Sequence, residues 1–175
     1  MGKRTGFMVL MACLFVLGMA ATFVAPVFAQ QAKVEYPEDY RSWHYLKSMV
    51  ISEGHPLFSI VPGLHHLYAN DIAFQHLKSG KNEPFPQGSK FAFELLDVAT
   101  TKNSVSTTKN KIVFVTQKDA AFGQTGGWGW EAWTLPGKER IVKDVDRQCA
   151  NCHYQSTSTF DGIWVKWDEV KNIAR

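Results

Sequence analysis

Two cysteines and a histidine stand together near the end of the chain, in the stretch QCANCHYQS at residues 148–156. Two residues separate Cys149 from Cys152, and His153 follows directly. Cys-x-x-Cys-His is the attachment motif of c-type haem, in which the thiols bind the two vinyl groups and the imidazole binds the iron. Helical residues i, i+3 and i+4 share one face, so this spacing brings the three side chains to one surface. The motif predicts one covalently attached haem c, with His153 as proximal iron ligand.

Three other uses of the two thiols are open, namely a disulfide, a redox-active dithiol and part of a zinc site. A dithiol motif does not require the adjacent histidine. A structural zinc ion takes four ligands, and the third cysteine, Cys13, lies far away in an apolar N-terminal run. The residues therefore favour haem over these alternatives.

The first residues predict a secretory leader. Two basic residues precede an uncharged apolar run that ends in small residues at Ala29, which is typical of a signal peptide. We expect residues 1–29 to be cleaved and residues 30–175 to form a single mono-haem domain. Residues 7–25 are long enough to span a membrane, and LMAC at residues 10–13 resembles a lipoprotein cleavage box, so two kinds of anchor are the alternatives. All three place the domain in the periplasm or otherwise outside the cytoplasm.

The composition argues against a nucleic-acid partner. The formal net charge of the chain is +3, and loss of the leader would remove two of the basic residues. Such a balanced charge offers no electrostatic basis for binding nucleic acid or anionic lipid. All six tryptophans lie outside the predicted leader, which is ample for one packed core.

The hydrophobic pattern predicts an α+β domain, rich in antiparallel sheet, with a few short helices. Helices are expected over residues 37–49, from Asn70 or Asp71 to Gly80, and over residues 142–153. Strands are expected over residues 64–69, 89–98, 111–117, 126–135 and 163–167, with a polar hairpin loop over residues 100–110. The glycines of residues 126–135 are expected to leave room for a bulky neighbour.

Few residues offer a sixth iron ligand. Met49 is the only methionine outside the predicted leader. The other histidines are expected on helix surfaces, in a turn, or as strand neighbours that face opposite sides: His44 and His76, His55, and His65 with His66. An open sixth position is therefore the leading hypothesis, and it points to the binding of a small ligand.

Five stretches occur in order along residues 36–170: YPEDYRSWHYLKS, GHPLFSIVPGLHHLYANDIAFQHLKSGK, FPQGS, GGWGWEAW and CANCH. Together they resemble the cytochrome P-460 family, which includes the cytochromes c′-beta. The resemblance implies a sheet-rich, single-haem c-type fold with a five-coordinate iron, and a homodimer. Some members oxidise hydroxylamine or related nitrogen species, whereas others bind NO and CO.

The resemblance also implies which residues line the ligand side of the haem. In the oxidising members a lysine bonds covalently to the haem edge, five residues past the glycine of an F-x-x-G turn, and the same count from Gly88 reaches Phe93. Lys90 has the opposite strand parity, so only a bulge would bring it to the side of Phe93. A distal carboxylate of those members aligns with Phe114, and a distal basic residue falls near His65.

Two aromatic residues in place of a lysine and a carboxylate would make the distal pocket apolar. Such a pocket favours a neutral diatomic ligand, because water or hydroxylamine would enter it without hydrogen-bond partners. The alternative is that Phe93 and Phe114 are ordinary core residues of a sheet.

Three functions follow from these observations. The leading one is a cytochrome of c′-beta type that binds NO or CO. The second is an enzyme that oxidises hydroxylamine or NO, for which Lys90 and Glu94 are the nearby candidates and both have the wrong parity. The third is a low-spin electron carrier with His65, His66 or Met49 as sixth ligand and an unidentified redox partner protein.

Overall fold

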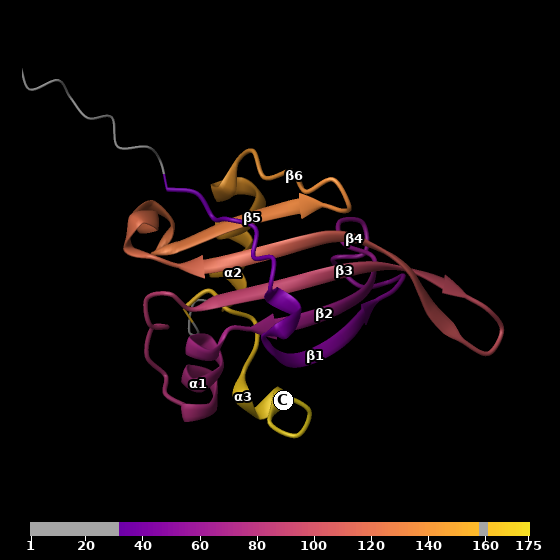
Figure 1. Cartoon of the computed structure of the whole chain (residues 1–175), viewed down its shortest axis with the longest axis horizontal. Coiled ribbons are helices and arrows are strands. Elements are labelled where there is room, and N and C mark those ends of the chain that lie inside the picture. The colour runs from indigo at the N-terminus through magenta and orange to yellow at the C-terminus, as the bar shows by residue number, and fades with distance from the viewer. Residues whose placement is uncertain (1–31, 158–160) are drawn as a thin grey trace, which may run out of the picture. The chain divides into compact units, whose positions relative to one another are not determined.

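The computed structural model describes residues 32–157 and 161–175, so the predicted leader over residues 1–29 lies outside the described part. The described residues form one six-stranded antiparallel sheet in which every strand pairs with its neighbour in sequence (Figure 1). The strands are β1 (His44–Ile51), β2 (Gly63–Ala69), β3 (Lys90–Thr100), β4 (Val105–Lys118), β5 (Trp128–Thr134) and β6 (Glu139–Arg140). The predicted α+β class with an antiparallel sheet is confirmed.

Short helices connect and cover the strands. They are η1 (Tyr40–Ser42), α1 (Asp71–Ser79), η2 (Ala120–Thr125), η3 (Asp146–Ala150), α2 (Asn151–Thr157) and α3 (Trp167–Val170). The predicted helix ending at Gly80 is confirmed as α1: the Asn70 side chain accepts a hydrogen bond from the Ala73 N–H, and Gly80 ends the helix in the left-handed conformation. None of the helices in the described ranges is long and apolar enough to span a membrane.

Strict alternation along β3 gives the sheet two different faces. Phe93 stands between Leu67 of β2 and Phe114 of β4, whereas Glu94 stands between His66 and Val113. Residues on one strand separated by two share a face. We call the face with Phe93 the α2 face and the face with Glu94 the η1 face, after the helices that cover them. Figure 1 shows η1 in front of the sheet and α2 behind it.

Each face packs against its own hydrophobic cluster. The cluster on the α2 face joins α1, the C-terminal segment and buried strand residues that include Phe91, Trp128 and Trp130. The cluster on the η1 face contains Val34, Tyr40, Ala92, Val113, Val115 and Trp133. Both faces of the sheet are therefore shielded from water over much of their area, and the order of side chains along β3 and β4 decides which residue meets which environment.

The predicted helix over residues 37–49 is wrong. Only the single turn η1 forms, and β1 begins at His44. The pairing of β1 with β2 shifts between Tyr45 and Lys47, and such an irregularity breaks the period of two that marks a strand. The apolar residues then recur at spacings of three and four, which resembles a helical period. His44 accordingly lies on a strand, where its ring stacks on Phe74 with the centroids 3.9 Å apart.

The predicted last strand over residues 163–167 is also wrong. Ile163 and Val165 are buried and Trp164 and Lys166 are exposed, so the alternation of an extended segment is present. Its backbone takes no place in the sheet ladder, and α3 starts at Trp167. Alternating burial follows from an extended chain lying on a core, and it does not require a strand partner.

The hairpin between β3 and β4 is longer than the pattern predicts. β4 starts at Val105 rather than at residue 111, so most of the predicted polar loop is strand, and Thr101 and Ser104 close the turn. Residues 101–109 are all exposed, and Figure 1 shows this end of the hairpin projecting beyond the neighbouring strands. A strand with no buried face lacks the hydrophobic alternation by which strands are recognised.

Gly129 in β5 confirms the expectation that a glycine there leaves room for a bulky neighbour. A Cβ atom at this position would lie 2.5 Å from the Phe122 ring and 2.7 Å from a Val34 methyl group. Only glycine allows these side chains to pack so closely on the backbone. Val34, Phe122 and Trp133 belong together in the packing of the η1 face.

A buried carboxylate ties η1 to the sheet. Glu94 is 2% exposed and accepts hydrogen bonds from the Tyr40 hydroxyl, at 2.7 Å, and from the Arg41 Nε, at 3.1 Å, with a further contact to Arg41 Nη2. Burial, and after it the hydrogen bond to Glu94, raises the pKa of Tyr40 above its ordinary value of 10.0, so the hydroxyl stays a donor. The charge on Glu94 is thereby neutralised on the η1 face.

The outer strand β1 also receives the end of the described chain. Arg175 exchanges two backbone hydrogen bonds with Tyr45, at 2.9 and 3.0 Å. At the opposite edge β6 contributes only two residues. The β1 edge of the sheet is thus partly covered by Arg175, and the β6 edge is very short.

Replacing Tyr40 by Phe should lower the free energy of unfolding by about 1.5–3 kcal/mol, because the buried Glu94 carboxylate loses a hydrogen bond. Urea denaturation followed by tryptophan fluorescence measures the change. Tyr45→Phe is the matched control, since the bond between the Tyr45 and Ser48 hydroxyls is exposed and its loss should cost less than about 0.5 kcal/mol. Equal losses in the two variants would show that Glu94 does not depend on Tyr40.

Candidate functional site

The Cys-x-x-Cys-His motif spans the junction of η3 and α2. Cys149 lies in the π-helical turn η3, and Cys152 and His153 lie in the first turn of α2. The predicted helix over residues 142–153 therefore begins at Asp146, four residues later than expected. Both thiols are free, Cys149 half-buried against the cluster of the α2 face and Cys152 exposed.

Polar side chains just before η3 start this helical segment. The Asp144 carboxylate accepts a hydrogen bond from the Arg147 N–H at 3.0 Å. The Gln148 side chain reaches back and accepts from the N–H groups of Lys143 and Asp144, both at 2.8 Å. These reciprocal bonds satisfy N–H groups that a helix start leaves without partners. They fix where the chain turns into the motif.

The imidazole of His153 is held in one tautomer. Its Nδ1 lies 2.7 Å from the Gly162 carbonyl oxygen, and because a carbonyl can only accept, Nδ1 carries the proton and Nε2 carries the lone pair. The ring stacks on Trp164 at 4.7 Å between centroids and lies 5.5 Å from the Trp130 ring. Burial lowers the pKa of His153, although the hydrogen bond to Gly162 opposes this effect. A neutral imidazole whose Nδ1–H is bonded to a backbone carbonyl is the usual form of a metal-bound histidine.

Burial also changes the first thiol of the motif. It raises the pKa of Cys149 to about 12, with smaller contributions from the negative charge of Glu131 and from Cys152. A thiol with so high a pKa is a poor thiolate nucleophile at neutral pH, which argues against a redox-active dithiol. The described residues also contain no group of three or more His, Cys, Asp or Glu side chains placed to hold a metal ion.

The predicted distal residues meet on the α2 face. The His65 ring stacks on Phe93 with the centroids 4.4 Å apart, and Phe93 lies 6.0 Å from Phe114. Phe93 and Phe114 are only half-buried, and neither belongs to the two hydrophobic clusters of the described residues. Their side chains are therefore partly accessible in the described part of the chain. Together they form an aromatic surface near the centre of the sheet.

The same face carries His153. Trp130, which contacts His153, shares its strand face with Ala132, and Ala132 pairs with Phe114 across β4 and β5. The histidine and the aromatic pair thus approach the sheet from one side. His65 is fully buried, and its Nε2 lies 2.8 Å from the Val61 carbonyl oxygen, which makes Nε2 the protonated nitrogen. Burial lowers the pKa of His65.

Two other predicted candidates lie elsewhere. Lys90 keeps the parity opposite to Phe93, because β3 pairs regularly with β4 from Lys90 to Leu95 and its irregularities come only after Leu95. The bulge that would bring Lys90 to the α2 face is therefore not there. Glu94 is engaged with Tyr40 and Arg41 on the η1 face. The wrong parity expected for both residues is confirmed.

These residues fit a haem. Two free thiols, a histidine in the metal-binding tautomer and a half-buried aromatic surface lie on one side of the sheet. The indole N–H groups of Trp128 and Trp130 are buried on this side and have no acceptor in the described part of the chain, so a bound group with oxygen or nitrogen acceptors would satisfy them. Cys149 and Cys152 would hold the haem edge, and His153 would bind the iron.

Some residues around the motif were not found from the sequence. Gly162 and Trp164 contact His153 although no spacing rule predicts a partner nine or eleven residues after the motif. Lys118 follows Phe114 and Thr116 at the spacing of two and so shares their face. That parity was available in the sequence, but its importance depends on Asp161, which comes from a distant loop.

Comparison with known protein families decides the class of this chain. Residues 37–164 match the family model described as Cytochrome P460. The chain belongs to this family. The match covers most of the chain and makes the protein a haem-binding cytochrome, as the resemblance of the five stretches predicts. A comparison with curated proteins gives no match.

The unequal burial of the two thiols of this cytochrome predicts unequal reactivity in the haem-free protein. At pH 8 a pKa of about 12 leaves roughly one Cys149 side chain in ten thousand as thiolate. Iodoacetamide should therefore modify exposed Cys152 well before Cys149 in folded, haem-free protein, as measured by peptide mass spectrometry. Denatured protein is the control and should show similar rates. Equal rates in the folded protein would contradict the burial of Cys149.

Proposed function

We propose that this protein is an exported mono-haem c-type cytochrome whose five-coordinate iron binds NO or CO in an apolar distal pocket. The observation that carries the proposal is the arrangement on the α2 face. His153 and the half-buried pair of Phe93 and Phe114 lie on one side of the sheet, and both acidic and lysine candidates lie on the other. Export, and assembly as a homodimer, belong to the same proposal and rest on the leader pattern and on the family resemblance.

The two cysteines supply covalent attachment. The thiols of Cys149 and Cys152 would hold the haem by adding to its two vinyl groups, which gives two thioether bonds and no leaving group. His153, the residue after Cys152, would bind the iron. When bound, the haem supplies an iron atom that takes a small ligand in its open position.

The protein side chains decide which ligand is favoured. His153 offers the Nε2 lone pair on one side, with its ring orientation fixed by the Gly162 carbonyl and by stacking on Trp164. Phe93 and Phe114 line the other side without a hydrogen-bonding atom. Water or hydroxylamine would lose hydrogen bonds on entering, at a cost of about 1–3 kcal/mol per unsatisfied group, whereas NO and CO would not.

The alternative of a hydroxylamine- or NO-oxidising enzyme finds less support. It needs a lysine at the haem edge and a base that accepts protons from the substrate. Lys90 has the wrong strand parity, and Glu94 is already neutralised by Tyr40 and Arg41. The alternative of a low-spin electron carrier needs a sixth protein ligand. His66 pairs with Glu94 and so lies on the η1 face, and His65 Nε2 is bonded to the Val61 carbonyl oxygen, which leaves only the buried Nδ1 of His65 to bind iron.

The first experiment is to produce the full chain in an exporting host that matures c-type haem. We expect denatured protein to retain the mass of one haem. We expect the ferrous protein to give a broad high-spin spectrum, with an ordinary Soret position that shifts on adding CO or NO. Sharp, split bands would instead mean a sixth protein ligand, and a strongly red-shifted Soret band would mean a haem cross-link and favour the enzyme. Either result would overturn the proposed function.

Replacing Phe114 by Glu tests the distal wall. A carboxylate should lower the affinity of the ferrous protein for CO by about tenfold, slow NO binding and strengthen the binding of water or hydroxylamine, because it adds a charged hydrogen-bond acceptor beside the ligand. Stopped-flow and equilibrium titrations measure these changes. Phe58→Glu is the control, since Phe58 lies in the exposed turn after β1 and is 40% exposed. Unchanged binding in Phe114→Glu would remove Phe114 from the distal wall.

A further inference from the structure

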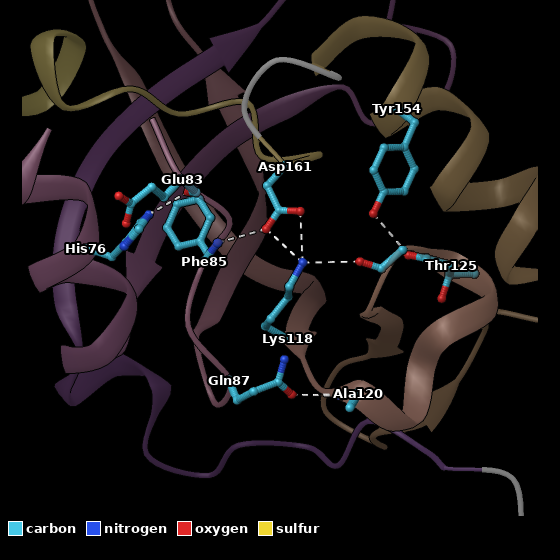
Figure 2. A network of polar contacts seen from close by, with 10 residues as sticks. His76, Glu83, Phe85, Gln87, Lys118, Ala120, Thr125, Tyr154 and Asp161 are labelled. Carbon is cyan, nitrogen blue, oxygen red and sulfur yellow. Dashed lines mark hydrogen bonds and ion pairs between the residues drawn. The ribbon is translucent and has the colours of Figure 1, made fainter. Parts of the chain in front are cut away.

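A buried ion pair lies beside the motif and has no part in the function proposed so far. Lys118, at the end of β4, is 6% exposed. Its Nζ donates hydrogen bonds to both carboxylate oxygens of Asp161, at 2.8 Å each, and to the Gly126 carbonyl oxygen, at 3.2 Å (Figure 2). The ammonium group has three hydrogens, so its hydrogen-bonding capacity is used in full. It also lies 4.9 Å from the centroid of the Trp128 ring.

The ion pair fixes the loop that supplies the partner of His153. Asp161 has a φ of +54°, in the left-handed region that a non-glycine residue seldom adopts. Its carboxylate also accepts a hydrogen bond from the Phe85 N–H at 2.9 Å. Lys118 and Phe85 thus hold the Asp161 carboxylate in place. The next residue, Gly162, supplies the carbonyl oxygen that accepts the hydrogen bond from His153 Nδ1.

The turn that receives Lys118 also receives the helix that carries His153. Tyr154, the residue after the histidine, donates its hydroxyl hydrogen to the Thr125 carbonyl oxygen at 3.1 Å. Figure 2 shows Tyr154 and Lys118 reaching adjacent carbonyl groups of this turn. A Cβ atom at Gly126 would lie 1.9 Å from the Tyr154 hydroxyl oxygen, so the contact is close. One turn therefore fixes both partners of the hydrogen bond between His153 and Gly162.

We propose that Lys118 and Asp161 are positioning residues that hold the Gly162 carbonyl against His153 Nδ1 and so fix the ring plane and tautomer of the proximal ligand. This inference rests on the proposed function, in which His153 binds the iron. The partner of a ligating histidine sets its orientation and basicity. Here the partner is the backbone carbonyl of Gly162, which a side-chain replacement cannot remove. The ion pair of Lys118 with Asp161, the preceding residue, sets the position of this carbonyl.

The test measures how fast the Nδ1 proton of His153 exchanges with D2O, by NMR of the histidine-labelled holoprotein. The ferrous CO complex is suitable, because it is diamagnetic and the proton gives a sharp signal. Asp161→Asn keeps the size of the side chain. If this variant fails to fold, the double variant Lys118→Met with Asp161→Asn replaces it, because the double variant leaves no unpaired buried charge. We expect exchange to become about tenfold faster in each folded variant.

Two controls separate positioning from general stability. Lys171→Met breaks an exposed ion pair with Asp168 and should leave the exchange unchanged. The backbone N–H of Val115, in the middle of the sheet, reports opening of the whole fold. If the rates of His153 and Val115 rise by the same factor, or if the His153 rate does not change, the pair only stabilises the fold and the inference is wrong.

The same samples distinguish failure of the proposed function from failure of the positioning role. A ferrous protein with a sixth protein ligand would be low-spin without CO, yet the Nδ1 proton could still be followed, so the positioning role would be judged independently of the ligand-binding role. A wild-type protein that carries no haem would overturn both proposals.

Discussion

A sheet that is covered on both faces must send alternate side chains into two different environments, and every functional feature of this cytochrome depends on that alternation. Phe93 and Glu94 are neighbours in sequence, yet one faces the helix with the haem motif and the other is buried beneath η1. A shift of pairing by one residue would exchange them and place a carboxylate beside Phe114 on the α2 face. The regular register of β3 with β4 from Lys90 to Leu95 is thus a chemical constraint as well as a structural one.

The haem motif itself lies outside the sheet and depends on the contacts that attach it. Trp130 supports the histidine ring from β5, and the peptide unit at Gly162 supports it from the C-terminal segment. The histidine is therefore oriented both by the packing of α2 on the sheet and by the segment that follows α2. Such an arrangement holds the His153 ring firmly and leaves the half-buried aromatic surface of Phe93 and Phe114 on the same face of the sheet.

Local patterns predicted much of this arrangement. The capping pattern gave α1, the alternation of β3 gave the correct faces for Lys90, Phe93 and Glu94, and the Cys-x-x-Cys-His motif lies in a helical segment as expected. The failures share a cause: periodicity reports burial and does not report pairing. An irregularity in β1 imitated a helix, and an extended segment after Gly162 imitated a strand. The partner of Lys118, Asp161, lies 43 residues away, and Gly162 and Trp164 follow His153 at spacings that match no regular element, so a single sequence carries no local signal for these contacts.

The edges of the sheet have a consequence for how the protein behaves among copies of itself. An exposed, regular edge strand is a template on which another chain can add. Here the backbone of Arg175 is hydrogen-bonded to Tyr45 at one end of β1, and β6 is two residues long. The pairing of β1 with β2 is irregular up to Lys47. In the described part of the chain these features shorten the regular strand edge on which a foreign strand could add.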